Sequence, residues 1–264
     1  MLQVRVKILY NKKIKGNYFY LVLRAPKIAK ESLPGQFLNI KVNDTYEPLL
    51  RRPVSIHIVK GANIELLYEV VGKATEILSR RKSGEYLDVI GPLGNGFSYQ
   101  SQARSQNPQV LVAGGMGIAP LIFLAEKLLK PRVSRHKSEV VVLIGAKTKD
   151  QILCEKELKN LGCEVKIATD DGSKGFKGYA SELLKEVLST IDYRLSTIYA
   201  CGPKPMLKEI TKISKKHTIP AQLSLEEHMA CGIGACLGCV VNTKEGFKRV
   251  CKEGPVFDGD GIIW

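Results

Sequence analysis

The chain has 264 residues, of which 44% are hydrophobic and 25% charged, and its formal net charge is +14 at pH 7. This length favours two domains plus a small addition, and the composition excludes a disordered or membrane-embedded protein. The basic residues are scattered and not interleaved with aromatic residues, so a solvated basic surface is the better interpretation and we expect no nucleic-acid partner.

No apolar stretch has the length of a signal peptide or of a membrane-spanning helix, so we expect a soluble cytoplasmic protein with no membrane span. The chain has seven cysteines. An odd number of cysteines in a reducing compartment indicates metal binding or redox chemistry and not a disulfide framework.

Residues 3 to 98 show mostly strand periodicity. Val4, Val6 and Ile8 alternate with charged residues, and turn residues such as Lys15-Gly16 and Pro34-Gly35 follow at short intervals. This pattern predicts a small antiparallel β-barrel, in which only residues 73–82 look helical.

Within the predicted barrel, Arg51-Arg52-Pro53-Val54-Ser55 offers a guanidinium and a hydroxyl at a strand start that proline makes rigid. These groups would suit a flavin pyrophosphate. Taken alone, the residues favour the alternative, which is a solvated pair of surface arginines.

The polar residues 101–108 have almost nothing to bury and predict a linker. After them, apolar runs at 110–113, 140–144, 165–168 and 198–200 alternate with helical segments at 119–130, 151–161, 180–188 and 204–216. Buried strands that alternate with helices predict a doubly wound parallel α/β domain. We place the domain bounds at residues 1–102, 108–222 and 223–264.

A glycine turn, Gly114-Gly115-Met116-Gly117, follows the first of these runs and precedes a helix. Backbone amides at such a helix start can hold a pyrophosphate, although the turn is not the usual G-x-G-x-x-G fingerprint and a plain tight turn is the alternative. The segments 170–173 and Cys201-Gly202-Pro203 also end strands, where open sheets bind ligands, and each is equally compatible with simple turn chemistry.

Four cysteines near the carboxyl end, Cys231, Cys236, Cys239 and Cys251, form a C-x4-C-x2-C-x11-C array. The first two spacings match those of plant-type 2Fe-2S ferredoxins, and the intervening glycines let backbone amides turn toward cluster sulfides. A structural zinc ion is the alternative, since it also takes four thiolates, but zinc sites usually pair two short cysteine knuckles. We interpret Cys154 and Cys163 as packing residues.

Together these segments resemble the ferredoxin-NADP reductase superfamily over essentially the whole chain. The stretch Met229-Ala230-Cys231-Gly232 and its following cysteines are most similar to electron-transfer subunits of type B dihydroorotate dehydrogenases. The resemblance implies three folded units: a flavin-binding barrel, an α/β nucleotide domain and a small iron-sulfur domain. It implies FAD and a 2Fe-2S cluster as cofactors and NAD as a substrate.

The resemblance also implies the site residues, and it assigns no catalytic side chain. The implied FAD contacts are Arg52, Pro53, Val54, Ser55, Leu67, Tyr68, Glu69, Ala74 and Thr75. The implied nucleotide contacts are Gly114, Gly115, Gly117, Cys201, Gly202 and Pro203. The implied cluster ligands are Cys231, Cys236, Cys239 and Cys251.

A nicotinamide gives up two electrons as a hydride, whereas a 2Fe-2S cluster accepts one at a time, so we expect a flavin to divide the pair. In the resembled family the electron partner is an FMN-containing catalytic subunit that oxidises dihydroorotate to orotate in pyrimidine biosynthesis, and a heterotetramer with two of each subunit is expected. The preference for NAD over NADP rests on this resemblance, since Lys147 and Lys149 would either attract a 2′-phosphate or face water.

Two alternatives stay open from the sequence. The first is the flavin and iron-sulfur subunit of a sulfhydrogenase or of an NADH-dependent ferredoxin:NADP oxidoreductase. The second is a non-enzymatic, zinc-containing module that senses a nucleotide.

Overall fold

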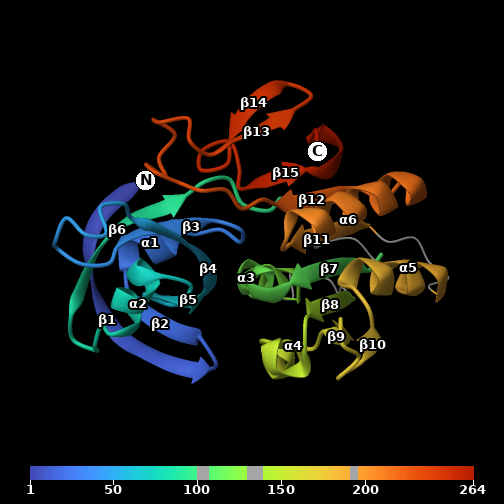
Figure 1. Cartoon of the computed structure of the whole chain (residues 1–264), viewed down its shortest axis with the longest axis horizontal. Helices are drawn as coiled ribbons and strands as arrows, with labels where there is room; N and C mark the ends of the chain where they lie inside the picture. The colour runs from blue at the N-terminus through green and yellow to red at the C-terminus, as the bar shows by residue number, and fades with distance from the viewer. Residues whose placement is uncertain (100–106, 130–138, 191–195) are drawn as a thin grey trace.

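The computed structural model describes residues 1–99, 107–129, 139–190 and 196–264. A barrel formed by the first part of the chain lies beside an α/β domain, and the carboxyl-terminal segment lies against both (Figure 1). The predicted three-part architecture is therefore confirmed. None of the described helices is long and apolar enough to cross a bilayer.

Six antiparallel strands close the barrel in the order β1-β2-β5-β4-β3-β6. Alternating side chains point inward along each strand and form one hydrophobic cluster, which includes Leu21, Ile40 and Leu66. The elements of this part are β1 (Leu2–Lys15), β2 (Tyr18–Arg24), α1 (Pro26–Glu31), β3 (Phe37–Lys41), β4 (Arg52–Lys60), β5 (Asn63–Glu69), α2 (Lys73–Ser79) and β6 (Tyr86–Leu93).

Two helical features of the barrel differ from the prediction. The helix expected at 73–82 ends at Ser79. The helix α1 was not expected, because its six residues are too few to show a helical period, although Pro26 begins it and Ile28 and Ala29 are buried.

The α/β domain contains a seven-stranded sheet in the order β10-β9-β8-β7-β11-β12-β15, parallel except for the last strand. Helices cover both faces: α3 and α4 pack into one hydrophobic cluster, and α5 and α6 pack into another. Its elements are β7 (Gln109–Gly114), α3 (Ile118–Leu129), β8 (Val140–Ala146), α4 (Glu155–Leu161), β9 (Glu164–Thr169), β10 (Phe176–Lys177), α5 (Ala180–Thr190), β11 (Thr197–Cys201), α6 (Lys204–His217) and β12 (Ala221–Ser224).

The helix expected at 151–161 begins only at Glu155. Cys154, directly before it, has φ 60° and ψ 9°, and a left-handed residue interrupts the helical hydrogen bonding. The predicted linker at 101–108 lies mostly outside the described residues.

The carboxyl-terminal segment contains a hairpin of β13 (Val240–Thr243) and β14 (Gly246–Arg249), then β15 (Val256–Asp258). β15 pairs antiparallel with β12, whose residues 221–224 span the predicted boundary at 222/223. This segment thereby extends the seven-stranded sheet and is fixed to it.

Candidate functional site

A cavity of about 450 Å³ opens beside the barrel, and we call it the barrel cavity. Eight of the nine residues predicted to contact FAD line it: Arg52, Pro53, Val54, Ser55, Leu67, Tyr68, Glu69 and Thr75. They come from β4 and β5, which pair with each other in the barrel, and from α2. The ninth, Ala74, is 3% exposed, packs into the barrel core and does not line the cavity.

The two neighbouring arginines have different surroundings. Arg51 lies 3.0 Å from the Asp88 carboxylate and also donates to the Asp88 carbonyl, so it forms an ion pair that joins the start of β4 to β6. Arg52 donates only to the nearby carbonyls of Leu50 and Arg51 in the described structure, and it lines the cavity. The guanidinium of Arg52 is therefore the one available to an anionic ligand.

Several lining residues were not predicted from the sequence, among them Phe37, Met116, Glu226, Met229 and Pro255. Glu226 is exposed to the cavity, yet the surrounding protein desolvates its carboxyl group and raises its pKa. The last three come from the carboxyl-terminal segment, which the pairing of β12 with β15 fixes to the sheet and which hydrogen bonds from Asn39 and Asn95 attach to the barrel. No local sequence signal indicates this pairing.

A second cavity, of about 500 Å³, lies at the carboxyl ends of the parallel strands, and we call it the sheet cavity. Gly114, Gly115 and Pro203 of the predicted nucleotide contacts line it, together with Lys147 and Asp170. Strand ends of an open parallel sheet are the usual place for a nucleotide. Lys147 and Asp170 offer opposite charges to a ribose or its phosphate.

The other predicted nucleotide contacts, Gly117, Cys201 and Gly202, line neither cavity and pack closely where the turn after β7 meets the end of β11. A Cβ on Gly117 would lie 2.0 Å from the Cys201 carbonyl oxygen, so only glycine lets the turn after β7 touch the end of β11. Met116, next to Gly115, lines the barrel cavity. The buried Cys201 thiol has its pKa raised by burial and by the nearby Glu226 carboxylate. The turn after β7 therefore borders both cavities, and we call this turn and the adjoining end of β11 the wall between them.

The four cysteines of the array lie in one loop region, in which Cys239 and Cys251 are buried and Cys236 is exposed. Each sulfur accepts a backbone N–H: Gly234 donates to Cys251 at 3.1 Å, Ala235 to Cys231 at 3.3 Å, Cys251 to Cys239 at 3.4 Å and Gly238 to Cys236 at 3.4 Å. Although burial alone would raise it, hydrogen bonds such as that from Ile233 lower the pKa of the Cys231 thiol to about 6. Amides turned toward sulfur suit thiolates that bind a metal cluster.

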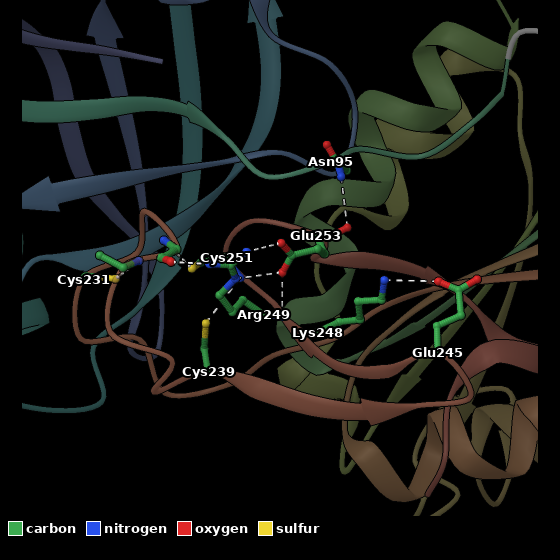
Figure 2. A network of polar contacts seen from close by, with 10 residues as sticks. Asn95, Cys231, Cys239, Glu245, Lys248, Arg249, Cys251 and Glu253 are labelled. Atoms are coloured by element: carbon green, nitrogen blue, oxygen red, sulfur yellow. Dashed lines mark hydrogen bonds and ion pairs between the residues drawn. The ribbon is translucent and has the colours of Figure 1, made fainter.

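An ion pair between Arg249 and Glu253 lies beside this cysteine loop (Figure 2). The Arg249 Nε donates to the Glu253 carboxylate at 3.0 Å, and its Nη1 donates to the Gly234 carbonyl at 2.6 Å. The Asn95 side chain, from the end of the barrel, donates to the Glu253 carbonyl at 3.0 Å. Arg249 thus supports the residue whose amide faces Cys251.

The spread of the sulfurs distinguishes between the two candidate metal groups. Four ligands of one tetrahedral zinc would bring their sulfurs within roughly 4 Å of one another. Among the side chains that the structure describes, no three of these four sulfurs come within 4.8 Å of one another. A two-iron cluster, whose ligands are divided between two metals, fits this wider arrangement.

Comparison with known proteins gives two matching family models. The iron-sulfur cluster binding domain of dihydroorotate dehydrogenase B matches residues 226–263, and an oxidoreductase NAD-binding domain matches residues 111–212. The chain is 42% identical to the dihydroorotate dehydrogenase B (NAD(+)) electron transfer subunit of Desulforamulus reducens, over 98% of this chain and 97% of that protein. It is 39% identical to the homologue of this subunit in Aquifex aeolicus, over 99% and 98%.

Among solved structures, an NADH-dependent reduced ferredoxin-NADP oxidoreductase involved in flavin-based electron bifurcation has a TM-score of 0.83 and 29% identity, over 98% of this chain and 90% of that chain. A ferredoxin NADP+ reductase from Neisseria gonorrhoeae, solved with FAD and NADP, has a TM-score of 0.68 and 16% identity, over 81% and 91%. The second likeness concerns the fold alone.

Proposed function

We propose that this chain carries electrons between NAD and a separate catalytic subunit that oxidises dihydroorotate. The proposal starts from the family: the chain belongs to the dihydroorotate dehydrogenase B electron-transfer subunits. The observation that carries this proposal is the arrangement of three sites in series. The sheet cavity and the barrel cavity share a wall, and the segment that bears the four cysteines supplies Met229 and Pro255 to the barrel cavity.

We assign FAD to the barrel cavity, with Arg52 and Ser55 toward its pyrophosphate and Leu67, Tyr68 and Glu69 along its length. We assign NAD to the sheet cavity at Gly114, Gly115 and Pro203, while Gly117, Cys201 and Gly202 shape the shared wall. Cys231, Cys236, Cys239 and Cys251 would hold the 2Fe-2S cluster. Ala74 supports the cavity from within the core and is not assigned a contact.

Bound FAD would supply the conversion between a two-electron hydride and single electrons. The protein's own contribution is orientation. The close approach of Gly117 to Cys201 keeps the wall thin, the burial of Cys201 keeps its thiol protonated, and the amides around Cys231 and Cys251 stabilise thiolate sulfur.

The partner in this proposal is an FMN-containing catalytic subunit, in a heterotetramer with two copies of each chain. Apolar side chains near the cysteine loop support a docking role for this face: Leu237 is 61% exposed and Phe247 is 78% exposed. We place the protein in the cytoplasm, where thiols such as its seven unpaired cysteines stay reduced.

The test is metal, sulfide and flavin analysis of the chain purified without oxygen, followed by activity measurements. We expect iron, acid-labile sulfide and FAD, with NADH-dependent reduction of an artificial acceptor but no turnover of dihydroorotate until the catalytic subunit is added. Cys236→Ser should lose iron and keep FAD, whereas Cys163→Ser, at a thiol outside the array, should keep both. Zinc in place of iron, or dihydroorotate turnover by the isolated chain, would refute the proposal.

A second candidate is supported by the likeness to the NADH-dependent reduced ferredoxin-NADP oxidoreductase, which covers nearly the whole chain. In that case the partner would be another flavoprotein that uses NADPH or ferredoxin. Purification of the complex from the native cell decides between them by the partner that accompanies the chain. Comparison of the reaction rates with NADH and with NADPH then reports whether the charge of Asp170 or that of Lys147 decides which nucleotide the sheet cavity prefers.

A further inference from the structure

Three side chains with metal-binding atoms meet at the junction of the barrel and the α/β domain. His57 comes from β4, Cys154 directly precedes α4, and Glu157 lies in the first turn of α4. Their ligand atoms all lie within 4.8 Å of one another, and they form the only such group of three in the part of the chain that the structure describes. None of the three lines the barrel cavity or the sheet cavity.

The His57 ring is held in the orientation that a metal ligand needs. It is fully buried, and its Nδ1 lies 3.0 Å from the Ala119 carbonyl oxygen, which can only accept a hydrogen bond. The Tyr20 ring packs edge-on at 5.7 Å and fixes the plane of the imidazole. A neutral ring that donates from Nδ1 leaves a lone pair on Nε2, and metal-bound histidines usually make this second hydrogen bond to a carbonyl or carboxylate.

The Nε2 atom is buried and has no hydrogen-bond partner within the described ranges. The Glu157 Oε2 lies 3.4 Å away, within ion-pair range, but the contact lacks hydrogen-bond geometry. A lone pair that faces a carboxylate across this distance is repulsive unless a proton or a cation lies between them. The site therefore calls for positive charge.

The spacing fits zinc. Two ligands bound at about 2.0–2.1 Å to a tetrahedral zinc ion lie roughly 3.4 Å apart, which is the distance between Nε2 and Oε2. Imidazole, thiolate and carboxylate together are a ligand set that zinc favours over magnesium or calcium. Lys60 and Lys15 act electrostatically on Glu157 and Cys154, but the Lys60 ammonium lies 2.9 Å from Glu65 and that of Lys15 donates to the Ile152 carbonyl.

An open path leads to the site. Cys154 and Glu157 line a groove of about 1130 Å³ between the two domains, so an ion can enter and water can reach the fourth position. Catalytic and exchangeable zinc sites keep such an open position, whereas fully structural ones are closed.

We propose that His57 Nε2, Cys154 Sγ and a Glu157 carboxylate oxygen bind one Zn²⁺ ion, with water from the groove as the fourth ligand. Because His57 belongs to the barrel and the other two residues to the α/β domain, the ion links the two domains (Figure 1). Cys154 is then a ligand and not the packing residue that the sequence suggested.

The test is zinc titration of the holoprotein after dialysis against a chelator, with iron and FAD measured in the same samples. X-ray absorption at the zinc edge detects zinc alone, so the iron cluster does not interfere. We expect one zinc per chain, with a single sulfur neighbour at about 2.3 Å and nitrogen or oxygen neighbours at roughly 2.0–2.2 Å. Zinc should also raise the melting temperature.

Variants assign the ligands. Cys154→Ser should remove the sulfur neighbour and abolish the thermal shift, and His57→Gln should weaken zinc binding by at least about tenfold. Cys163→Ser is the matched control, because it removes a buried thiol of the same domain that lies outside the group, and its zinc binding should be unchanged.

Three results would overturn the proposal. First, a wild-type holoprotein that binds no zinc would mean that His57 and Glu157 simply pair with each other. Second, zinc with four sulfur neighbours, bound while iron is lost, would place the ion at the cysteine array. Third, equal zinc affinity in Cys154→Ser and wild type would exclude Cys154 as a ligand. A wild-type spectrum without a sulfur neighbour would exclude it as well, and this measurement does not depend on whether a variant folds.

Discussion

The side-chain amide of Asn39 donates a hydrogen bond to the backbone carbonyl of Cys231 across 3.0 Å. Asn39 lies opposite Pro53 in the β3–β4 pairing, and Pro53 lines the barrel cavity. Gly232, at φ +68°, lies so close that a Cβ there would be 2.4 Å from the Asn39 amide nitrogen. The cysteine loop is therefore attached to the barrel one strand away from the cavity assigned to FAD.

Asn39→Ala should loosen this attachment. The partly buried Cys231 carbonyl loses its partner, which costs about 0.5–1.5 kcal/mol of stability. We expect less iron per chain at unchanged FAD, measured by metal and flavin analysis and by denaturant unfolding. Asn43→Ala is the control, since it removes an amide that bonds only the Glu47 carbonyl of its own loop. Parallel loss of FAD and iron would show that Asn39 supports the barrel and not the loop.

The two adjacent arginines should separate flavin binding from barrel stability. Arg52→Ala removes the guanidinium that lines the barrel cavity, and loss of a charged hydrogen bond should weaken FAD binding by about 1.5–3 kcal/mol, roughly ten- to 150-fold. Arg51→Ala breaks the ion pair with Asp88 and should lower the melting temperature while FAD affinity stays close to wild type. FAD fluorescence titration of both variants checks this. The reverse pattern would move the phosphate contact to Arg51.

Gly117→Ala should disturb the wall between the cavities. The added methyl group would lie 2.0 Å from the Cys201 carbonyl oxygen, so backbone must shift, at a cost of about 1–3 kcal/mol. We expect weaker NADH binding together with lower stability. Gly261→Ala is the control, because nothing lies within 4 Å of its added Cβ. Wild-type NADH affinity in Gly117→Ala would mean that the turn does not shape the nucleotide site.

Local sequence patterns predicted the parts of this molecule but not all of their contacts. Strand periodicity predicted the barrel and apolar runs predicted the parallel sheet, whereas the residues of β4 and β5 that line the barrel cavity were predicted from the resemblance to a known family. Glu226 and Pro255 were not predicted to line that cavity, because the pairing of β12 with β15 depends on packing between distant segments.

The amino end of α4 is a second feature that the sequence did not predict. A left-handed backbone at a cysteine carries no sequence signal, since glycine and asparagine are the residues that usually adopt it. The prediction therefore extended the helix through Cys154 and gave that residue a packing role. Its proximity to His57, from a strand almost a hundred positions earlier, follows only from the docking of the two domains.

The pH dependence of the Arg249–Glu253 pair follows from the lowered pKa of Glu253. Its hydrogen bonds with Arg249 lower the pKa from 4.5 to about 2. A carboxyl group whose pKa is lower in the folded state stabilises the fold above its unfolded pKa, and this contribution is lost as the pH falls toward the folded pKa. The stability difference between wild type and Glu253→Gln should thus be constant from neutral pH to about pH 5 and shrink below pH 4.5. Urea unfolding at several pH values measures it. A difference that already falls between pH 7 and pH 5 would contradict the pairing.

The contribution of Glu226 to stability should change with pH in the opposite direction, because desolvation in the barrel cavity raises the pKa of Glu226 in the folded protein. A carboxyl group with a raised folded pKa binds its proton more tightly in the folded state, so stability is highest below the unfolded pKa and declines as the pH rises through the folded pKa. Glu226→Gln removes the charge and should stabilise the apoprotein at neutral pH, with the gain vanishing in acid. Its neighbour Glu227 forms an ion pair with Lys204, so Glu227→Gln should instead be neutral or destabilising at the same pH. Thermal unfolding of both variants at neutral and acidic pH distinguishes the effects of the two carboxylates.

If Glu226→Gln also destabilises the protein at neutral pH, the Glu226 carboxylate has a cationic partner in solution. The barrel cavity would then be more polar than its lining indicates.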